Sequence, residues 1–323
     1  MEKKPDAVSD EVEGWIGRWL SFRLTQCHPR ILEWQGEEKT RANLETSIYG
    51  ELARLGDEEI QRKYAEACPV EGASPGDYGI RFLELEGVGS LLAGIHFYGL
   101  DLARPFVHVS AFDFELNADH ASLLQSLIRR EFSVFSPVQF RIWVDSEHSF
   151  AAGFPGAELD NWFLAGALRD IQKSGLPVNS SRISLVADPA LDSYSALVKC
   201  HRDYLKDNPG MEAWLESPDR KLMEASAKDG KYYRVHIDGE PAGWIAGKTD
   251  DSGPLSGWQV LALFLEPRFR GQGFAPAMQR AFLDTLPAED LIWGTIDVRN
   301  AASLATARRV GREIVCGYLF LPL

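Results

Sequence analysis

The chain has 323 residues, more than the roughly 100–200 residues of one ordinary domain, so we expect two domains. Hydrophobic residues make up 45% of it and charged residues 25%, a composition typical of a globular protein with an ample core. The formal net charge of −13 disfavours a general nucleic-acid or anionic-membrane surface and mildly favours basic or amine-bearing partners.

The four cysteines are scattered, without a Cys-x-x-Cys pair or an accompanying histidine cluster. We therefore expect neither a metal site nor a disulfide framework. Residues 1–6 lack the apolar core of a signal peptide, and no stretch approaches the ~20 apolar residues of a membrane span. These features predict a cytoplasmic protein with reduced thiols and with no nucleic-acid or membrane partner.

Residues 9–68 have the pattern of helices, and residues 57–59 are expected to open a short one. One interpretation is a substrate-covering cap or a homodimer surface; helices packed on their own domain are the favoured alternative. Two apolar stripes at helical spacing support the prediction: Val12, Trp15, Ile16 and Trp19, then Leu44, Ile48, Leu52 and Leu55.

Residues 78–144 predict three strands, a helix and a fourth strand. The turn after the third strand, residues 115–120, is acidic and has no glycine, so it would repel a phosphate group. The expected strands are 80–85, 90–98, 105–114 and 138–144, and the helix is 119–135, with Leu123, Leu124, Leu127 and Ile128 facing inward.

Residues 149–161 have loop composition, a helix is expected over 161–173, and residues 174–181 break it. We place the domain boundary there, giving domains of 1–175 and 181–323. The second domain should begin with a strand at 183–187, helices at 193–205 and 211–227, and a hairpin of strands 231–237 and 242–248.

Residues 258–286 read as strand, basic turn and helix. The run 258–265 is almost entirely apolar, as expected for a strand buried on both faces. Gly271 and Gly273 let a ligand approach backbone N–H groups, the helix start contributes partial positive charge, and Arg268 and Arg270 add full charges. The turn is therefore predicted to hold an anion such as a pyrophosphate.

Two better-known phosphate motifs do not fit. Residues 271–276 lack the third glycine of the dinucleotide fingerprint and are followed by no acidic ribose ligand on a strand. Residues 247–249 resemble the end of a P-loop, but Ala242 stands where its first glycine is required.

Residues 268–273 instead resemble motif A of the GCN5-related N-acetyltransferases (GNAT): Arg or Gln, two residues, Gly, one residue, then Gly or Ala. A second family element is recognisable in the strand 291–298 followed by Asn300, Ser303 and Gly311. The chain departs from the family at Arg312, where an aromatic residue is usual, and at Arg308, where many members carry a tyrosine as general acid. The resemblance covers residues 181–323.

The resemblance implies an α/β (mixed α+β) GNAT acyl-CoA N-acyltransferase fold. Because the N-terminal half repeats the order of strands and helix, we expect a tandem of two such domains, the first degenerate and preceded by a helical segment. The expected activity is transfer of acetyl from acetyl-CoA, or of another acyl group from its CoA ester, to an amine. The co-substrate is acetyl-CoA, no metal is needed, and the acceptor is a small-molecule amine or a protein or peptide amine.

The resemblance also assigns roles to residues. Glu266 and Asp297 are candidate bases for the acceptor amine, the main-chain N–H near Leu265 is the expected oxyanion donor, and Tyr318 is a candidate acid for the thiolate, with Cys316 also nearby. Tyr194, His201, Tyr204 and Trp214 could line the acceptor site, although packing roles are favoured. The expected cofactor-binding residues are Phe264, Leu265, Arg268, Phe269, Arg270, Gly271, Gln272, Gly273, Phe274, Ala275, Asn300 and Ser303.

Two other functions stay open at this point. An aminoacyl-tRNA-dependent peptidyl transferase also pairs two such folds, although the intact turn and the acidic charge favour CoA. An acyl-CoA-binding regulator would keep the turn without a working base.

Overall fold

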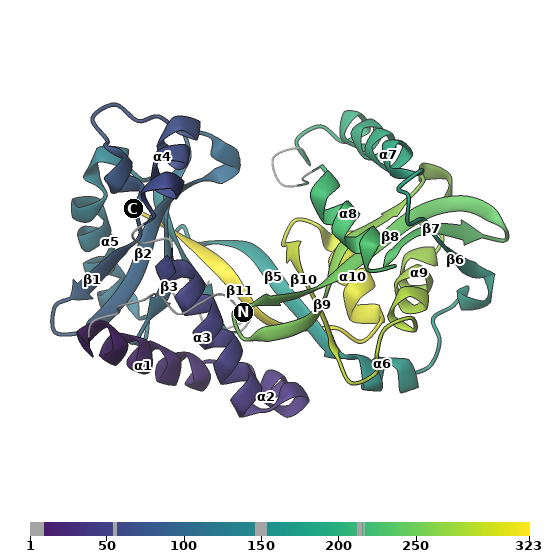
Figure 1. Cartoon of the computed structure of the whole chain (residues 1–323), viewed down its shortest axis with the longest axis horizontal. Coiled ribbons are helices and arrows are strands. Elements are labelled where there is room, and N and C mark those ends of the chain that lie inside the picture. Colours follow the sequence, from purple (N-terminus) through teal and green to yellow (C-terminus); the bar gives the residue numbers. More distant parts are fainter. Residues whose placement is uncertain (1–9, 54–56, 146–153, 212–214, 216) are drawn as a thin grey trace. The chain divides into compact units, whose positions relative to one another are not determined.

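The computed structural model describes residues 10–53, 57–145, 154–211, 215 and 217–323 (Figure 1). The chain divides into two compact units. Unit 1 comprises Met1–Asn161, Ser252–Pro254 and Val315–Leu323, and unit 2 comprises Trp162–Asp251 and Leu255–Ile314. No helix among the described residues is long and apolar enough to cross a membrane.

Unit 1 contains the expected helical segment followed by a sheet with strand order β1-β2-β3-β4-β11. Strands β1, β2 and β3 pair antiparallel, β3 and β4 pair parallel, and β4 pairs antiparallel with β11. The helices are α1 (Asp10–Thr25), α2 (Pro29–Gln35), α3 (Glu37–Ala53), α4 (Glu58–Ala67) and α5 (Ala118–Glu131), and the strands are β1 (Arg81–Leu85), β2 (Gly89–Phe97), β3 (Pro105–Phe112), β4 (Gln139–Val144) and β11 (Glu313–Pro322).

The core of unit 1 joins these helices to the sheet. Trp19 of α1 is fully buried and its ring stacks on Phe82 of β1, with centroids 5.7 Å apart. In α5, Leu124 and Ile128 are buried as expected, whereas Leu123 is 47% exposed, so its expected inward orientation is wrong. The helical period of 3.6 residues turns position 123 about 100° away from position 124.

Unit 2 has a sheet with strand order β5-β10-β9-β8-β7-β6. Strands β6, β7 and β8 pair antiparallel, and β9 pairs parallel with β10. The strands are β5 (Glu158–Ala167), β6 (Ile183–Ala187), β7 (Tyr232–Ile237), β8 (Glu240–Ser252), β9 (Leu255–Leu265) and β10 (Leu291–Asp297), and the helices are α6 (Leu168–Lys173), α7 (Tyr194–Asp207), α8 (Arg220–Lys228), α9 (Phe274–Leu283) and α10 (Ala301–Arg309).

The helix expected over residues 161–173 is wrong in its first half. Trp162, Phe163, Leu164 and Ala165 belong to β5, and the helix α6 begins only at Leu168. These four residues are at most 5% exposed. A short run that is apolar on every side suits a strand inside a sheet as well as a buried helix, and periodicity alone does not separate the two.

The helix expected over residues 211–227 is also shorter than predicted. Its described part, α8, begins at Arg220, where Asp219 caps it by accepting the N–H of Leu222 at 2.9 Å. Pro218 precedes the cap and disfavours helical geometry in the residue before it. Residues 212–214 and 216, including the predicted acceptor-site residue Trp214, lie outside the described residues.

The expected domain ranges of 1–175 and 181–323 stay a prediction, and the compact units have other bounds. Residues 162–173 belong to unit 2 because β5 neighbours β10 in its sheet. Residues 315–323 belong to unit 1 because β11 pairs with β4, from Gly317 opposite Val144 to Pro322 opposite Gln139.

Candidate functional site

The turn between β9 and α9 presents a row of backbone N–H groups. Gly271 and Gly273 have φ angles of 73° and 79°, in the left-handed region that glycine adopts without strain. Gly273 is also the N-cap of α9. Among the described residues, none accepts a hydrogen bond from the N–H of Gly271, Gln272 or Gly273. Adjacent free N–H groups at a helix start form an anion-binding turn.

The space around this turn is open. A Cβ added to Gly271 would meet no atom within 4 Å, and one added to Gly273 would meet only Nδ2 of Asn179, at 3.7 Å. Two side-chain hydrogen bonds brace the turn: Gln272 Nε2 donates to the carbonyl oxygen of Arg268 at 2.6 Å, and Asn179 Nδ2 donates to that of Gln272 at 3.2 Å. A phosphate group can therefore approach the backbone directly.

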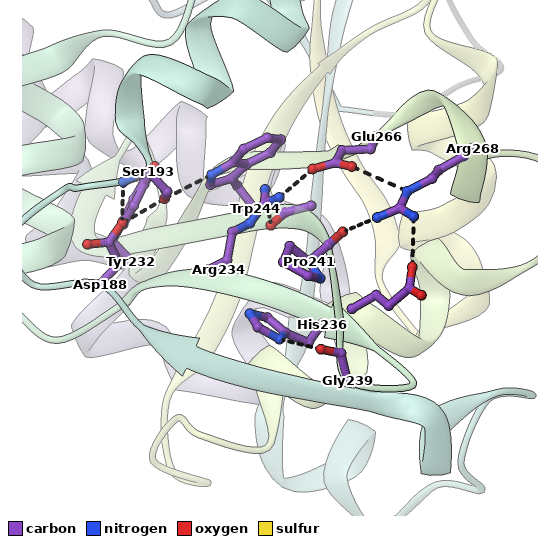
Figure 2. Close-up of polar contacts among 12 residues, drawn as sticks. Asp188, Ser193, Tyr232, Arg234, His236, Gly239, Pro241, Trp244, Glu266 and Arg268 are labelled. Atoms are coloured by element: carbon purple, nitrogen blue, oxygen red, sulfur yellow. Dashed lines mark hydrogen bonds and ion pairs between the residues drawn. The ribbon is translucent and has the colours of Figure 1, made fainter.

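Both arginines of the turn are engaged elsewhere. Arg268 lies 2.7 Å from the Glu240 carboxylate and donates to the Pro241 carbonyl at 3.0 Å (Figure 2). Arg270 donates from Nε to the carbonyl oxygen of Leu265 at 2.8 Å. Arg268 is thus paired with a carboxylate, whereas Arg270 donates to an uncharged carbonyl group. The predicted contact of either guanidinium with a phosphate stays a prediction.

Strands β9 and β10 pair at one end and separate toward the turn. Their register pairs are Ile292 opposite Trp258 and Trp293 opposite Gln259, whereas β9 continues to Leu265 and β10 to Asp297. Residues 259–264 of β9 are only half-buried, so the expectation of burial on both faces is wrong. The reason is that a strand without a partner along one edge keeps that edge accessible.

The backbone of Leu265 faces this separated edge. The N–H of the next residue, Glu266, donates to the carbonyl oxygen of Ala242 in β8 at 2.8 Å. Backbone groups of successive strand residues point to opposite sides, so the N–H and C=O of Leu265 point away from β8, toward β10. The hydrogen bond from Arg270 to the Leu265 carbonyl agrees with that direction.

Glu266 lies between two guanidinium groups. Its Oε1 accepts a hydrogen bond from Arg234, and its Oε2 lies 3.6 Å from Nε of Arg268 (Figure 2). The Arg234 guanidinium in turn stacks on the Trp244 ring, 3.8 Å from its centroid. The Glu266 side chain remains 24% exposed, so one carboxylate oxygen is loosely held and accessible.

Asp297 and Asn300 organise the turn into α10. Arg299 pairs with both carboxylate oxygens of Asp297, at 2.8 and 2.5 Å, and its N–H donates to the first of them at 2.8 Å. Asn300 caps α10 by accepting the N–H of Ser303 at 3.1 Å. Asp297 is thus more firmly paired than Glu266. Contacts of Asn300 and Ser303 with the cofactor stay predictions.

The side chains of the other predicted cofactor-binding residues mostly pack in the hydrophobic core or against α7. Phe274 is 1% exposed and packs against Phe269, with centroids 6.3 Å apart. Ala275 packs against the same core cluster. Phe264 contacts His201 and Tyr204 of α7, at 5.8 Å from each ring. What these positions can offer a cofactor is therefore chiefly their backbone.

Tyr318, the candidate general acid, belongs to unit 1, whereas the turn belongs to unit 2. Its ring packs against His108 and Trp143 of unit 1, at 5.3 and 5.6 Å. Burial raises the pKa of the Tyr318 hydroxyl. Cys316 also belongs to unit 1 and is buried. The role of Tyr318 as general acid stays a prediction.

A half-buried set of polar side chains fixes the start of α7. Ser193 Oγ donates to Asp188 at 2.6 Å and accepts from Trp244 Nε1 at 2.9 Å (Figure 2). Asp188 also accepts the N–H groups of Asp192 and Ser193, and these hydrogen bonds outweigh its desolvation and lower the pKa of its carboxyl. Trp244 is 1% exposed, so its N–H depends on Ser193.

Arg234 and Trp244 connect these polar side chains to Glu266. The sequence does not predict this role, because neither residue falls in a motif. Arg312 stands where the GNAT family usually has an aromatic residue, and the sequence predicts no role for it. Its guanidinium is buried and donates to the carbonyl oxygens of Leu164 at 2.8 Å and Gly294 at 3.2 Å, joining β5 to β10. Burial lowers the pKa of Arg312 to about 9, so the group is charged at neutral pH.

Within the described residues, no group of three or more His, Cys, Asp and Glu side chains is arranged to hold a metal ion. The free N–H groups and the separating parallel strands belong to an α/β domain, unit 2, whose turn has a geometry suited to an anion. Residues 197–311 match the model of the Acetyltransferase (GNAT) family, and this part of the chain is a GNAT domain. No curated protein sequence matches the chain.

Solved structures with similar chains include a GCN5-related N-acetyltransferase from Sphaerobacter thermophilus (14% identity, 81% of this chain and 84% of that chain, TM-score 0.44). A GNAT-family acetyltransferase from Colwellia psychrerythraea is 10% identical over 82% of this chain and 96% of that chain, with a TM-score of 0.44. A tandem GNAT protein from the clavulanic acid biosynthesis pathway is 13% identical over 83% and 96%, with a TM-score of 0.42. Likenesses of this size say nothing about substrate.

Proposed function

We propose that the protein is an acyl-CoA-dependent N-acyltransferase that transfers an acyl group, most simply acetyl, to an amine. The observation that carries the proposal is the turn of free N–H groups at Gly271, Gln272 and Gly273, placed where β9 and β10 separate. Acetyl-CoA supplies an acyl group activated as a thioester. A pyrophosphate suits the N–H turn, and an extended amide-bearing arm suits a strand edge with free backbone groups.

The residues around the separated edge would then have distinct tasks. The Leu265 N–H points to that edge and would donate to the acyl carbonyl oxygen as negative charge develops, an interaction whose loss costs about 3 kcal/mol in comparable sites. Glu266 faces the same side of the sheet as Phe264, two residues earlier, and so faces α7.

We assign Glu266 as the group that removes the acceptor's proton, directly or through a water. An alkyl amine has a pKa of about 10 and must lose a proton before it attacks. The loosely held Oε2 of Glu266 is open to this task, whereas Arg299 occupies both oxygens of Asp297. Asp297 is then a positioning residue for the turn into α10.

Unit 1 supports a tandem arrangement by its topology. Its strand order β1-β2-β3-β4, with a helix joining the parallel pair β3 and β4, repeats in unit 2 as β7-β8-β9-β10, with α9 joining β9 and β10. The turn after β3 differs in chemistry: Asn117 caps α5 by accepting the N–H of His120 at 2.9 Å, and no glycine is present. We propose that unit 1 is a degenerate GNAT-like domain that does not bind CoA.

The test is thermal unfolding of three proteins with and without acetyl-CoA: wild type, Gly271→Glu and Gly87→Glu. Gly87 is a matched control, because it also has a φ of 73° and no atom within 4 Å of an added Cβ, but lies in the β1–β2 turn. Ligand at about 100 times its dissociation constant should stabilise wild type and Gly87→Glu by ~2.7 kcal/mol. Gly271→Glu, with a carboxylate in the turn, should show no shift.

A shift that persists in Gly271→Glu would contradict the assignment of the turn, provided that both variants fold. Absence of a shift in wild type, also with longer acyl-CoAs, would overturn the proposed function. Binding without turnover on any amine would point to an acyl-CoA-binding regulator, a function compatible with the pairing of both candidate carboxylates to arginines.

A further inference from the structure

Arg270 is a half-buried cation with an unused hydrogen-bond donor. Its Nη2 is fully shielded from solvent and has no hydrogen-bond partner among the described residues. Its Nε donates to the Leu265 carbonyl at 2.8 Å. The guanidinium carbon packs against two aromatic rings that contact each other edge to face, 4.4 Å from the centroid of Tyr204 and 4.9 Å from that of Phe264. A buried donor without a partner is costly and marks a position for a missing acceptor.

Among the described residues of unit 2, no carboxylate pairs with Arg270, in contrast to its neighbours. Glu266 forms ion pairs with Arg234 and Arg268, and Glu240 forms an ion pair with Arg268. The nearby thiol of Cys200 is not an anion either, because burial raises its pKa. The positive charge of Arg270 is therefore available to a ligand.

The position of Arg270 relates it to the acceptor side of the site. Tyr204 lies on α7, and Phe264 lies beneath α7 on the face of β9 that also carries Glu266. The side chain of Arg270 folds back toward β9 and reaches the carbonyl oxygen of Leu265. Its free nitrogen thus lies near the residue whose N–H we assign to the acyl carbonyl.

We infer that the acceptor is an amine that carries a carboxylate close to its amino group, as an amino acid does, and that Arg270 binds this carboxylate. The inference rests on the proposed function, since it names the acceptor class of the same site. A planar guanidinium that packs against two aromatic rings and keeps one nitrogen without a partner among the described residues suits a carboxylate. Because Arg270 contacts Leu265 directly, the carboxylate and the reacting amine must be only a few bonds apart.

The experiment measures CoA release with acetyl-CoA and twenty α-amino acids, each against its own α-carboxamide, which keeps the amine and removes the charge. We expect wild type to prefer the best acid over its amide by roughly tenfold or more in kcat/KM, as for other hydrogen bonds to charged groups. Arg270→Gln should abolish this preference without raising KM for acetyl-CoA, and Arg270→Lys should retain part of it. Arg202→Gln, an exposed arginine on α7, should keep the full preference.

A second readout needs no turnover. Calorimetry with the N-acetyl form of the preferred amino acid should detect binding to wild type and to Arg202→Gln, and weaker binding, by roughly tenfold, to Arg270→Gln and to the N-acetyl amide. Binding of this kind with no turnover on any amine would uphold the anion site and overturn the proposed function.

Equal turnover of acids and amides by wild type would overturn the inference and leave the proposed function intact. The same holds if Arg270→Gln raises KM for acetyl-CoA and keeps the acid preference, because Arg270 would then serve the CoA arm. Circular dichroism and the unfolding temperature establish that each variant is folded.

Discussion

At the end of β9, Glu266 shares its carboxylate between Arg234 and Arg268, and the two contacts are unequal. Arg234 engages Oε1 in a hydrogen bond, whereas Arg268 lies 3.6 Å from Oε2 and is itself bound to Glu240. A carboxylate that is fixed on one side and accessible on the other can be oriented without losing its ability to accept a proton.

Glu266→Gln should therefore lower kcat by about 10²–10⁴-fold, the usual contribution of a general base. The amide still accepts a hydrogen bond from Arg234, so the unfolding shift produced by acetyl-CoA should not change. Asp297→Asn should lower kcat by much less, because Asp297 holds Arg299 and the turn into α10. Steady-state kinetics of both variants with a working acceptor provide the check.

The opposite ranking, with Asp297→Asn the more damaging change, would transfer the base role to Asp297. Unchanged kcat in both single variants and in the double variant would remove both carboxylates from the mechanism.

At the scale of elements, α7 is held to the sheet at its start. Ser193 lies at the N-cap of α7, and its hydroxyl connects Asp188 to Trp244 of β8. Trp244 supports Arg234 by stacking, and Arg234 holds Glu266. The helix that lines the proposed acceptor side and the proposed base are thus joined through the Ser193 hydroxyl, Trp244 and Arg234 (Figure 2).

Ser193→Ala should destabilise the protein by about 1–3 kcal/mol, because the buried Trp244 N–H loses its acceptor. Ser193→Thr, which keeps the hydroxyl, is the matched control and should lose much less. Urea unfolding of the two variants measures the difference. We also expect Ser193→Ala to raise KM for the acceptor more than KM for acetyl-CoA, since the turn at Gly271 is held by other residues.

A loss of stability as small in the alanine variant as in the threonine variant would show that the hydroxyl does not hold α7. An equal rise in both KM values would show that its effect is not confined to the acceptor side.

At the scale of the whole molecule, the two compact units are not the two halves of the chain. Unit 2 begins at Trp162, and β5 contributes the Leu164 carbonyl that Arg312 binds and the Phe163 ring that stacks on Trp293. Leu168 and Ile171 of α6 enter the core cluster of unit 2.

A fragment of residues 158–314 should therefore unfold cooperatively, whereas a fragment of 181–314 should not. The shorter fragment leaves the buried Arg312 without one of its two carbonyl acceptors and removes a neighbour of β10, a loss of several kcal/mol compared with a total stability of about 5–15 kcal/mol. Differential scanning calorimetry distinguishes the outcomes. Equally sharp transitions in both fragments would support the domain start at residue 181.

The sequence alone determined the features that depend on neighbours along the chain. Gly271 and Gly273 require left-handed backbone, Asn300 caps the next helix, and the strand, turn and helix around them follow from local pattern. The resemblance to the GNAT family rested on these residues, and the family match at 197–311 confirms it.

The partners of side chains and strands that are far apart in the chain follow from the tertiary structure. Arg270 turned to Leu265 and Tyr204, Tyr318 was carried into unit 1 by the pairing of β11 with β4, and residues 162–165 became a strand within the sheet of unit 2. The physical reason is the same in each case. Burial and sheet pairing are settled between segments far apart in the chain, and a local pattern of apolar and charged residues does not record which partner is nearest.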